Sequence, residues 1–65
     1  MYKNLNIELA RKCWNIQDLS NHTGINYQTL VTKLNGKSSF KFDECRLIKK
    51  SLNSELPLES LFLNE

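Results

Sequence analysis

Residues 15–36 read NIQDLSNHTGINYQTLVTKLNG, and this stretch decides the expected fold. Asn15 stands where a helix N-cap belongs, and Asp18 follows three residues later, which is a variant of the capping box. Gly24 is suited to end that helix, because glycine adopts the left-handed conformation without steric cost. The pattern therefore predicts a helix over about 16–23.

A second helix is expected to follow almost at once. Asn26 is a good N-cap for it, and Asn35-Gly36 is a stop signal, which together predict a helix over about 27–34. The turn between the two helices is too short for antiparallel packing, so the helices must cross steeply, as in a helix-turn-helix. We expect Leu19 and Leu30 to hold the pair together from the inside.

Helical periodicity continues toward the N-terminus. Leu5, Leu9 and Cys13 recur every four residues and predict a helix over about 2–12. Three further residues are expected to widen the same apolar face: Ile7, Ala10 and Trp14.

Two more helices are expected toward the C-terminus. One begins near Phe42, with Asp43 and Glu44 at its start, and its inner residues are Cys45, Ile48 and Leu52, with Phe40 and Phe42 packed under its first turn. Pro57 suits the first turn of a last short helix with apolar residues Leu58, Leu61 and Phe62. No segment alternates with period two for long enough to form a strand. The expected fold is a compact all-α bundle of about five short helices.

Length and composition limit the class of protein. Sixty-five residues form one small domain, 1–65, and a composition of 40% hydrophobic and 25% charged residues is ordinary for a folded chain. No apolar run approaches the roughly 20 residues of a membrane span, and no charged-then-apolar leader begins the chain. We therefore expect a cytoplasmic protein, complete as written, without membrane association. Its two cysteines, Cys13 and Cys45, lie on apolar faces and are expected to be buried thiols.

Charge is distributed unevenly. The chain up to Lys50 holds all nine basic residues against four acidic ones, a net charge of +5, whereas residues 51–65 hold only acids and carry −3. Residues 19–42 contain Lys33, Lys37 and Lys41 and no acid. This distribution favours a polyanionic partner, with an ordinary solvated surface as the alternative.

The outward face of the predicted 27–34 helix supports a nucleic acid as that partner. Its expected outward residues are Tyr27, Gln28, Val31, Thr32 and Lys33, none of which is a carboxylate. An α-helix fits the major groove of DNA, where glutamine can pair with adenine and a methyl group can contact thymine.

At this point the chain resembles the Cro/repressor-type helix-turn-helix transcriptional regulators, especially the short ones from phages and prophages of Gram-positive bacteria. The matching residues extend over nearly the whole chain: Glu8-Leu9-Ala10-Arg11-Lys12, Asp18-Leu19, Thr23-Gly24-Ile25, Thr29-Leu30, Lys33-Leu34-Asn35-Gly36-Lys37, Phe40, Glu44, Ile48 and Leu61-Phe62. The resemblance implies a lambda-repressor-like bundle that regulates transcription as a homodimer on a palindromic double-stranded DNA operator. The dimer forms either in solution or only on DNA.

The resemblance also implies which residues touch DNA. The base-reading residues are Tyr27, Gln28, Thr29 and Thr32. The backbone contacts are Asn15, Gln17, Asn26, Lys33, Asn35, Lys37 and Lys41. For Tyr27 the alternative is a ring packed over the helix start, and for Lys37 and Lys41 it is plain solvation. Two departures from the family pattern are Cys13, where a glycine often ends the first helix, and Lys41, where a Thr or Ser cap is usual.

Other functions remain as alternatives or are disfavoured. His22 is the only histidine and has no acid beside it, so an enzyme, a cofactor, a metal site and a small-molecule substrate are all disfavoured. The main alternative is a protein-binding module on the same fold, such as an antitoxin or a repressor-binding phage protein. Apolar residues near the C-terminus are candidates for the dimer contact: Leu58, Leu61, Phe62 and Leu63.

Overall fold

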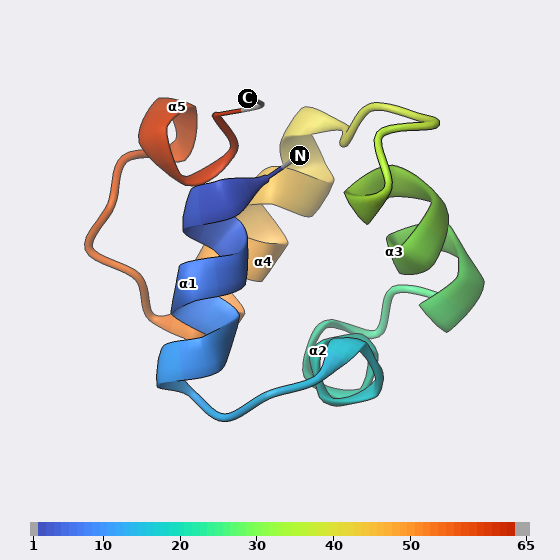
Figure 1. The fold of residues 1–65 in the computed structure, drawn as a ribbon, viewed down its shortest axis with the longest axis horizontal. Helices are drawn as coiled ribbons and strands as arrows, with labels where there is room; N and C mark the ends of the chain where they lie inside the picture. The colour runs from blue at the N-terminus through green and yellow to red at the C-terminus, as the bar shows by residue number, and fades with distance from the viewer. Residues whose placement is uncertain (1, 64–65) are drawn as a thin grey trace.

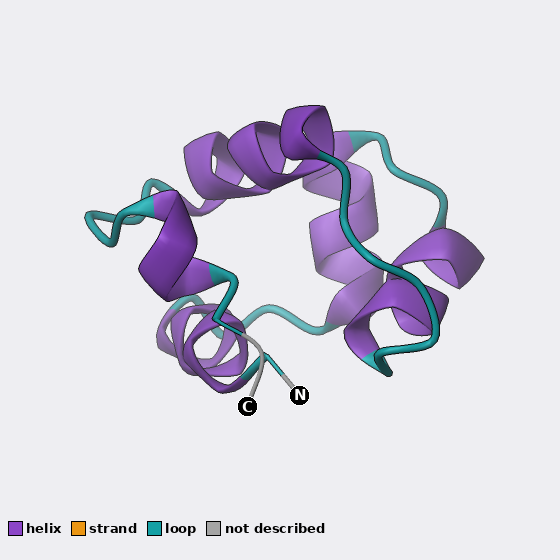
Figure 2. Cartoon of the chain, turned by 90° about the horizontal axis from the view of Figure 1, so that it is seen from above, coloured by secondary structure: helices purple, strands orange, loops and turns teal. Residues whose placement is uncertain are grey.

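Five helices make up the part of the chain described by the computed structural model, residues 2–63 (Figure 1). They are α1 (Lys3–Arg11), α2 (Ile16–Thr23), α3 (Tyr27–Leu34), α4 (Phe42–Leu52) and α5 (Leu58–Leu61). This range contains no strand and measures 25 × 22 × 20 Å along its principal axes (Figure 2). The all-α expectation is confirmed, and the bounds of α2 and α3 agree with those predicted. Met1 and residues 64–65 of the expected 1–65 domain lie outside the described range.

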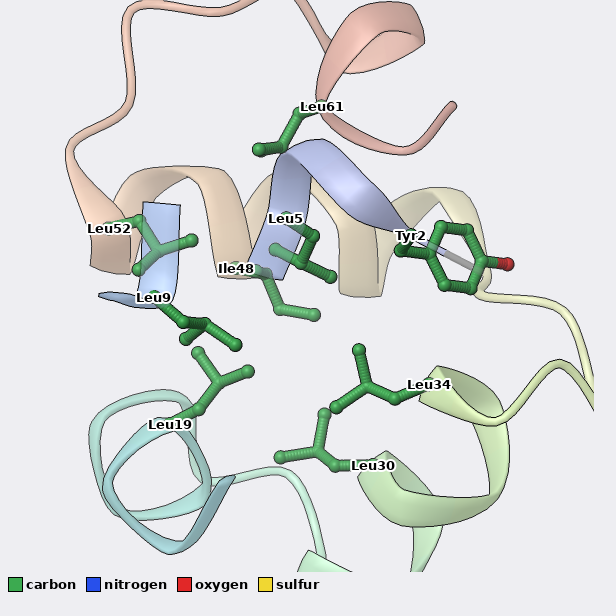
Figure 3. Close-up of a cluster of buried hydrophobic side chains, with 9 residues drawn as sticks. All are labelled: Tyr2, Leu5, Leu9, Leu19, Leu30, Leu34, Ile48, Leu52 and Leu61. Atoms are coloured by element: carbon green, nitrogen blue, oxygen red, sulfur yellow. The ribbon is translucent and has the colours of Figure 1, made fainter. Parts of the chain in front are cut away.

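The core is formed by side chains from all five helices, which converge on one centre (Figure 3). Leu19 of α2, Leu30 of α3 and Ile48 of α4 are fully buried there. Burial of each such side chain contributes about 1.5–3 kcal/mol to folding. The other buried hydrophobic residues are Tyr2, Leu5, Leu9, Leu34, Leu52 and Leu61. Because α2 packs against both α3 and α4, this part of the core sets the orientation of the three helices relative to one another.

The start and end of α2 form as predicted. The Asn15 side chain accepts a hydrogen bond from the Asp18 backbone N–H (2.8 Å), and the Asn15 N–H donates to the Asp18 carboxylate (3.0 Å). Gly24 ends the helix with φ +77°, a conformation that side chains rarely adopt. The capping box and the glycine together limit α2 to eight residues.

Side-chain hydrogen bonds hold the turn between α2 and α3. The Ser20 hydroxyl donates to the Ile25 carbonyl (2.6 Å), and the Thr23 hydroxyl accepts from the Ile25 N–H (3.2 Å). Asn26 then caps α3 by accepting from the N–H groups of Gln28 (2.8 Å) and Thr29 (3.2 Å). The short turn is therefore bonded to the helix before it and to the helix after it.

An ion pair joins α3 to α4. Lys33 is buried, with 8% of its surface exposed, and its ammonium group bonds the Glu44 carboxylate. The same carboxylate accepts the backbone N–H of Lys41 (2.8 Å), which precedes α4. The expected outward position of Lys33 is therefore wrong. The residue lies beside Leu34 on the buried side of α3, where its aliphatic stem covers the core and its charge is neutralised.

The first and fourth helices bury fewer apolar residues than expected. Ile7 (49% exposed), Ala10 and Cys13 are exposed because the inner face of α1 is the narrow line through Leu5 and Leu9. Cys13 lies beyond the end of α1 with φ +59° and is exposed, so it is not the expected buried thiol. Phe42 is 66% exposed and lies under the Arg46 guanidinium instead of packing beneath α4.

The last helix, α5, contributes to the core. Leu61 is fully buried, so its expected role in a dimer contact is wrong; α5 has four residues and packs against α1 and α4 through this side chain. The Phe62 ring packs edge-to-face against Tyr2 and Phe40, at centroid distances of 6.1 and 5.2 Å. Of the four C-terminal candidates, only Leu63, at 48%, is an exposed residue. In the described range, no helix has the length and apolar character needed to cross a membrane.

The first prediction concerns Glu44. The bond from Lys33, followed by the bond from the Lys41 backbone, lowers the pKa of this carboxyl from its usual 4.5. Because the folded pKa is lowered, the stabilisation is complete above the unfolded pKa and is lost as pH falls through the folded value. Glu44→Gln should reduce the free energy of unfolding by about 1–3 kcal/mol near pH 7. It should also flatten the acid branch of stability against pH, measured by urea unfolding.

Asp43→Asn is the matched control, since Asp43 is an exposed acid in the same helical turn and makes no ion pair within residues 2–63. If the stability of the two variants depends on pH in the same way, the ion pair of Glu44 does not stabilise the fold as described.

Candidate functional site

The outer face of α3 is the candidate functional site. Leu30, Lys33 and Leu34 face inward, and this leaves the opposite side of the helix to solvent. Gln28 and Thr32 lie one turn apart on that outer side, and Gln28 is exposed while Thr32 is partly exposed. Tyr27, with 44% of its surface exposed, and the partly exposed Thr29 flank them in the first turn. Of the four predicted base-reading residues, Gln28 and Thr32 thus share the outer side of α3, and Tyr27 and Thr29 lie on its flanks.

Helix α3 and the connections on either side of it carry charged side chains of one sign only. Lys37 and Lys41 are exposed in the connection between α3 and α4, and residues 19–42 contain no acid. Lys33 is removed from this set because Glu44 neutralises it. Two lysines of the acid-free stretch therefore remain exposed, one fewer than the sequence pattern indicated.

Three of the predicted backbone contacts lie at the ends of α3: Asn26 at its N-terminal end, and Asn35 and Lys37 at its C-terminal end. The connection that holds Lys37 leaves the C-terminal end of α3, while α2 lies at its N-terminal end (Figure 1). Asn35 ends α3 and is exposed, and the Lys37 N–H bonds the Thr32 carbonyl (3.2 Å), which holds the connection against the helix. The candidate groups therefore extend along the length of α3.

Several predicted contact residues already have structural tasks. The Asn15 side-chain oxygen caps α2, and the Asn26 side-chain oxygen caps α3. The Gln17 amide donates to the Asn21 side-chain oxygen (3.1 Å) on the surface of α2. The side-chain NH₂ groups of Asn15 and Asn26 are not needed for capping. These two residues can therefore donate a hydrogen bond to a ligand without losing the cap.

The sequence analysis did not predict an aromatic stack between Trp14 and His22, which lies in the last turn of α2. His22 is exposed, and its ring lies parallel to the Trp14 indole, with a centroid distance of 4.0 Å and an interplanar angle of 7°. No periodic signal relates residues 14 and 22, because the chain turns between α1 and α2 before the rings meet. The stack joins the α1–α2 connection to the last turn of α2.

The cysteines and acids offer no metal centre in the described part of the chain. Within residues 2–63, no three His, Cys, Asp or Glu side chains are grouped so that they could hold an ion. Cys13 is exposed, whereas Cys45 is partly buried, and burial together with the charge of Glu44 raises the pKa of its thiol.

Comparison with known proteins gives no relative. No protein-family model matches the sequence, and neither a curated protein nor a solved structure is significantly similar to the chain. The resemblance to Cro/repressor-type regulators therefore stays a hypothesis.

Proposed function

We propose that the protein is a sequence-specific double-stranded DNA-binding regulator of transcription. In this proposal α2 and α3 act as a helix-turn-helix, and α3 enters the major groove. The observation that carries the proposal is the outer face of α3, where uncharged hydrogen-bonding side chains are exposed and no carboxylate is present. Major-groove recognition needs groups of this kind on a helix of this width.

The positions of Gln28 and Thr32 support base reading. They lie four residues apart on the outer side of α3, so about 6 Å along the helix axis separates them. Glutamine can form two hydrogen bonds with adenine, and the threonine methyl can contact the thymine methyl. Tyr27 and Thr29 lie in the first turn of the same helix, and in this proposal they contact neighbouring bases or sugars.

Phosphate contacts would come from the groups around α3. Lys37 and Lys41 supply charge from the α3–α4 connection, and Asn15, Gln17 and Asn35 supply neutral polar groups. Such contacts position a protein on the duplex without reading its sequence. They also release counterions, which makes the affinity depend on salt. Lys33 has no part in this proposal, since its charge is neutralised by Glu44.

A protein-binding role on the same scaffold is the second candidate. It is favoured by exposed apolar side chains outside α3: Phe42 at 66%, Ile7 at 49% and Leu63 at 48%. The two candidates differ in a measurable way. A DNA-binding regulator binds duplex DNA without a partner, and its affinity falls steeply with salt.

Gln28→Ala tests base reading. It should weaken binding to a duplex selected from a random pool by about 1–3 kcal/mol and leave binding to unrelated duplexes unchanged, because only the base contact is lost. Fluorescence anisotropy on both duplexes measures the effect. Gln17→Ala is the matched control and should weaken binding to both duplexes equally. Equal losses for Gln28→Ala would exclude a base-reading role.

Lys37→Ala tests the electrostatic contact. It should weaken binding to all duplexes alike and flatten the slope of log K against log salt by about one unit, since one phosphate contact is lost. Arg11→Ala is the control, because Arg11 is a cation on α1 that lies beside the α4–α5 connection. An unchanged slope for Lys37→Ala would show that this lysine is merely solvated.

A palindromic site should bind two copies. One α3 offers three or four base-reading side chains, which is a small set for specific recognition. Two copies related by a two-fold axis place their α3 helices about 34 Å apart, one helical turn of DNA. Gel shifts on half-site and full-site duplexes, with light scattering for mass, should show cooperative binding of two copies. Tight binding to a lone half-site, with no gain from a second half-site at any spacing, would contradict the dimer.

A further inference from the structure

Two adjoining hollows lie along α4. The larger has a volume of about 370 Å³ and lies between α4, the α4–α5 connection and the first residue of α5. We call it the basic hollow, and its lining residues are Arg46, Lys49, Lys50, Asn53, Ser54 and Leu58. The second hollow, of about 300 Å³, shares Arg46 and Lys50 with the first and adds Asp43 and Leu47. The two hollows therefore form one continuous surface.

The basic hollow carries positive charge that the described chain does not neutralise. Arg46, Lys49 and Lys50 make no ion pair within residues 2–63. Glu55 and Glu59 are nearby in the sequence, but neither lines the hollow. The helix dipole favours Lys49 and Lys50 in the last turn of α4, whereas Arg46 lies a turn earlier. Like charges three and four residues apart repel each other on a helix, so an anion in the hollow would relieve this repulsion.

Part of the basic hollow is held in place by the chain itself. Asn53 ends α4 in the left-handed conformation, with φ +53°. Ser54 then bonds back to α4, since its N–H donates to the Lys49 carbonyl (3.3 Å) and its carbonyl accepts from the Lys49 ammonium group (2.9 Å). An ammonium group has three N–H donors, so two of those of Lys49 remain for a ligand. The hollow thus presents at least one cation in a fixed position.

The wall that the α4–α5 connection forms lies on the opposite side of the molecule from α3. In Figure 1 this connection and α5 are at the left, and α3 is at the right. A duplex against the outer face of α3 would therefore leave this wall uncovered. Leu58 and Leu47 add apolar contacts to the two hollows, and phosphate groups cannot use such contacts. These features favour an occupant other than nucleic acid.

We propose that the basic hollow binds an acidic segment of a partner protein. Carboxylates of the segment face Arg46, Lys49 and Lys50, and an apolar side chain of the segment contacts Leu58. Asp43, at the far end of the second hollow, limits the acidic contact to the C-terminal half of α4. The proposal gives a site and a partner chemistry to the protein-binding role, and it does not depend on DNA binding by α3.

The shape of the surface favours a peptide segment over a small anion. Both hollows are shallow, whereas a small-molecule site encloses most of its ligand. From Asp43 to Lys50 the two hollows extend about 10 Å along the axis of α4. An extended segment of three or four residues covers about this length. Several carboxylates of one segment can therefore reach the three cations at once.

Fluorescence anisotropy at low salt, with a labelled peptide of repeated Glu-Glu-Leu triplets, tests the proposal. The full chain should bind this peptide, and the affinity should fall as salt is raised. A peptide of Gln-Gln-Leu triplets should not bind, because it lacks carboxylates. A peptide of Glu-Glu-Gly triplets should bind about threefold more weakly, because the apolar contact is lost.

Variants of the chain place the peptide on its surface. Lys50→Glu should raise the dissociation constant about tenfold, because it puts a carboxylate among those of the peptide. Lys3→Glu makes the same charge change at an exposed position of α1 and is the matched control, with an effect below about twofold. Arg46→Gln is a milder second variant and should cost about threefold. Thermal unfolding followed by circular dichroism checks that each variant is folded.

Four results would overturn the proposal. The native chain does not bind the acidic peptide, or Lys50→Glu and Lys3→Glu weaken binding equally, which would indicate general attraction to a basic protein. Lys37→Glu weakens binding more than Lys50→Glu, which would place the peptide beside α3. Inorganic phosphate or a duplex of random sequence displaces the peptide, and its own binding is lost in Lys50→Glu, which would make the hollow a phosphate site. All the peptide measurements are made without DNA, so their failure leaves the proposed function of α3 untouched.

Discussion

The hydrogen bonds that hold the Gly24–Asn26 turn determine the direction of α3, and much of the structure depends on that direction. Ser20 and Thr23 fix Ile25 from the end of α2, and Asn26 fixes the first turn of α3. With the turn held, Leu30 must enter the core beside Leu19. A helix of eight residues that buries one side has only one other side to present to solvent. The candidate site is therefore a consequence of how the turn is bonded.

The ion pair between Lys33 and Glu44 is a second restraint on the same helix. It joins the last turn of α3 to the first turn of α4, and the Glu44 carboxylate also holds the Lys41 backbone N–H. A lysine in this position contributes packing by its stem and requires a carboxylate for its charge. The electrostatic consequence is that positive charge near α3 comes from Lys37 and Lys41 in the connection and not from the helix itself.

Local signals in the sequence predicted the helices, and residues that act through tertiary packing escaped prediction. The Asn15–Asp18 box, Gly24 and Asn26 act on neighbouring backbone groups, so a short stretch of sequence is sufficient to recognise them. Lys33 escaped because its partner lies eleven residues away, and a lysine normally indicates a solvent-facing position.

Apolar residues in short helices were also hard to place. Spacing alone does not decide which of the apolar residues of α1 or α4 lies inward, and Ile7 and Phe42 are both exposed. Leu61 was assigned to a dimer contact although the small core requires it. For the candidate site, the outer face of α3 followed from the positions of Leu30 and Leu34, while its use in binding DNA remains a prediction.

The central claim is that the outer face of α3 contacts duplex DNA. Titration of isotope-labelled protein with a selected duplex, followed by amide NMR shifts, tests it most directly. The account predicts the largest shifts in residues 26–32, with smaller, salt-sensitive shifts at residues 15–17 and 37. Shifts confined to α1, α4 and α5, or no shifts at low salt, would contradict it.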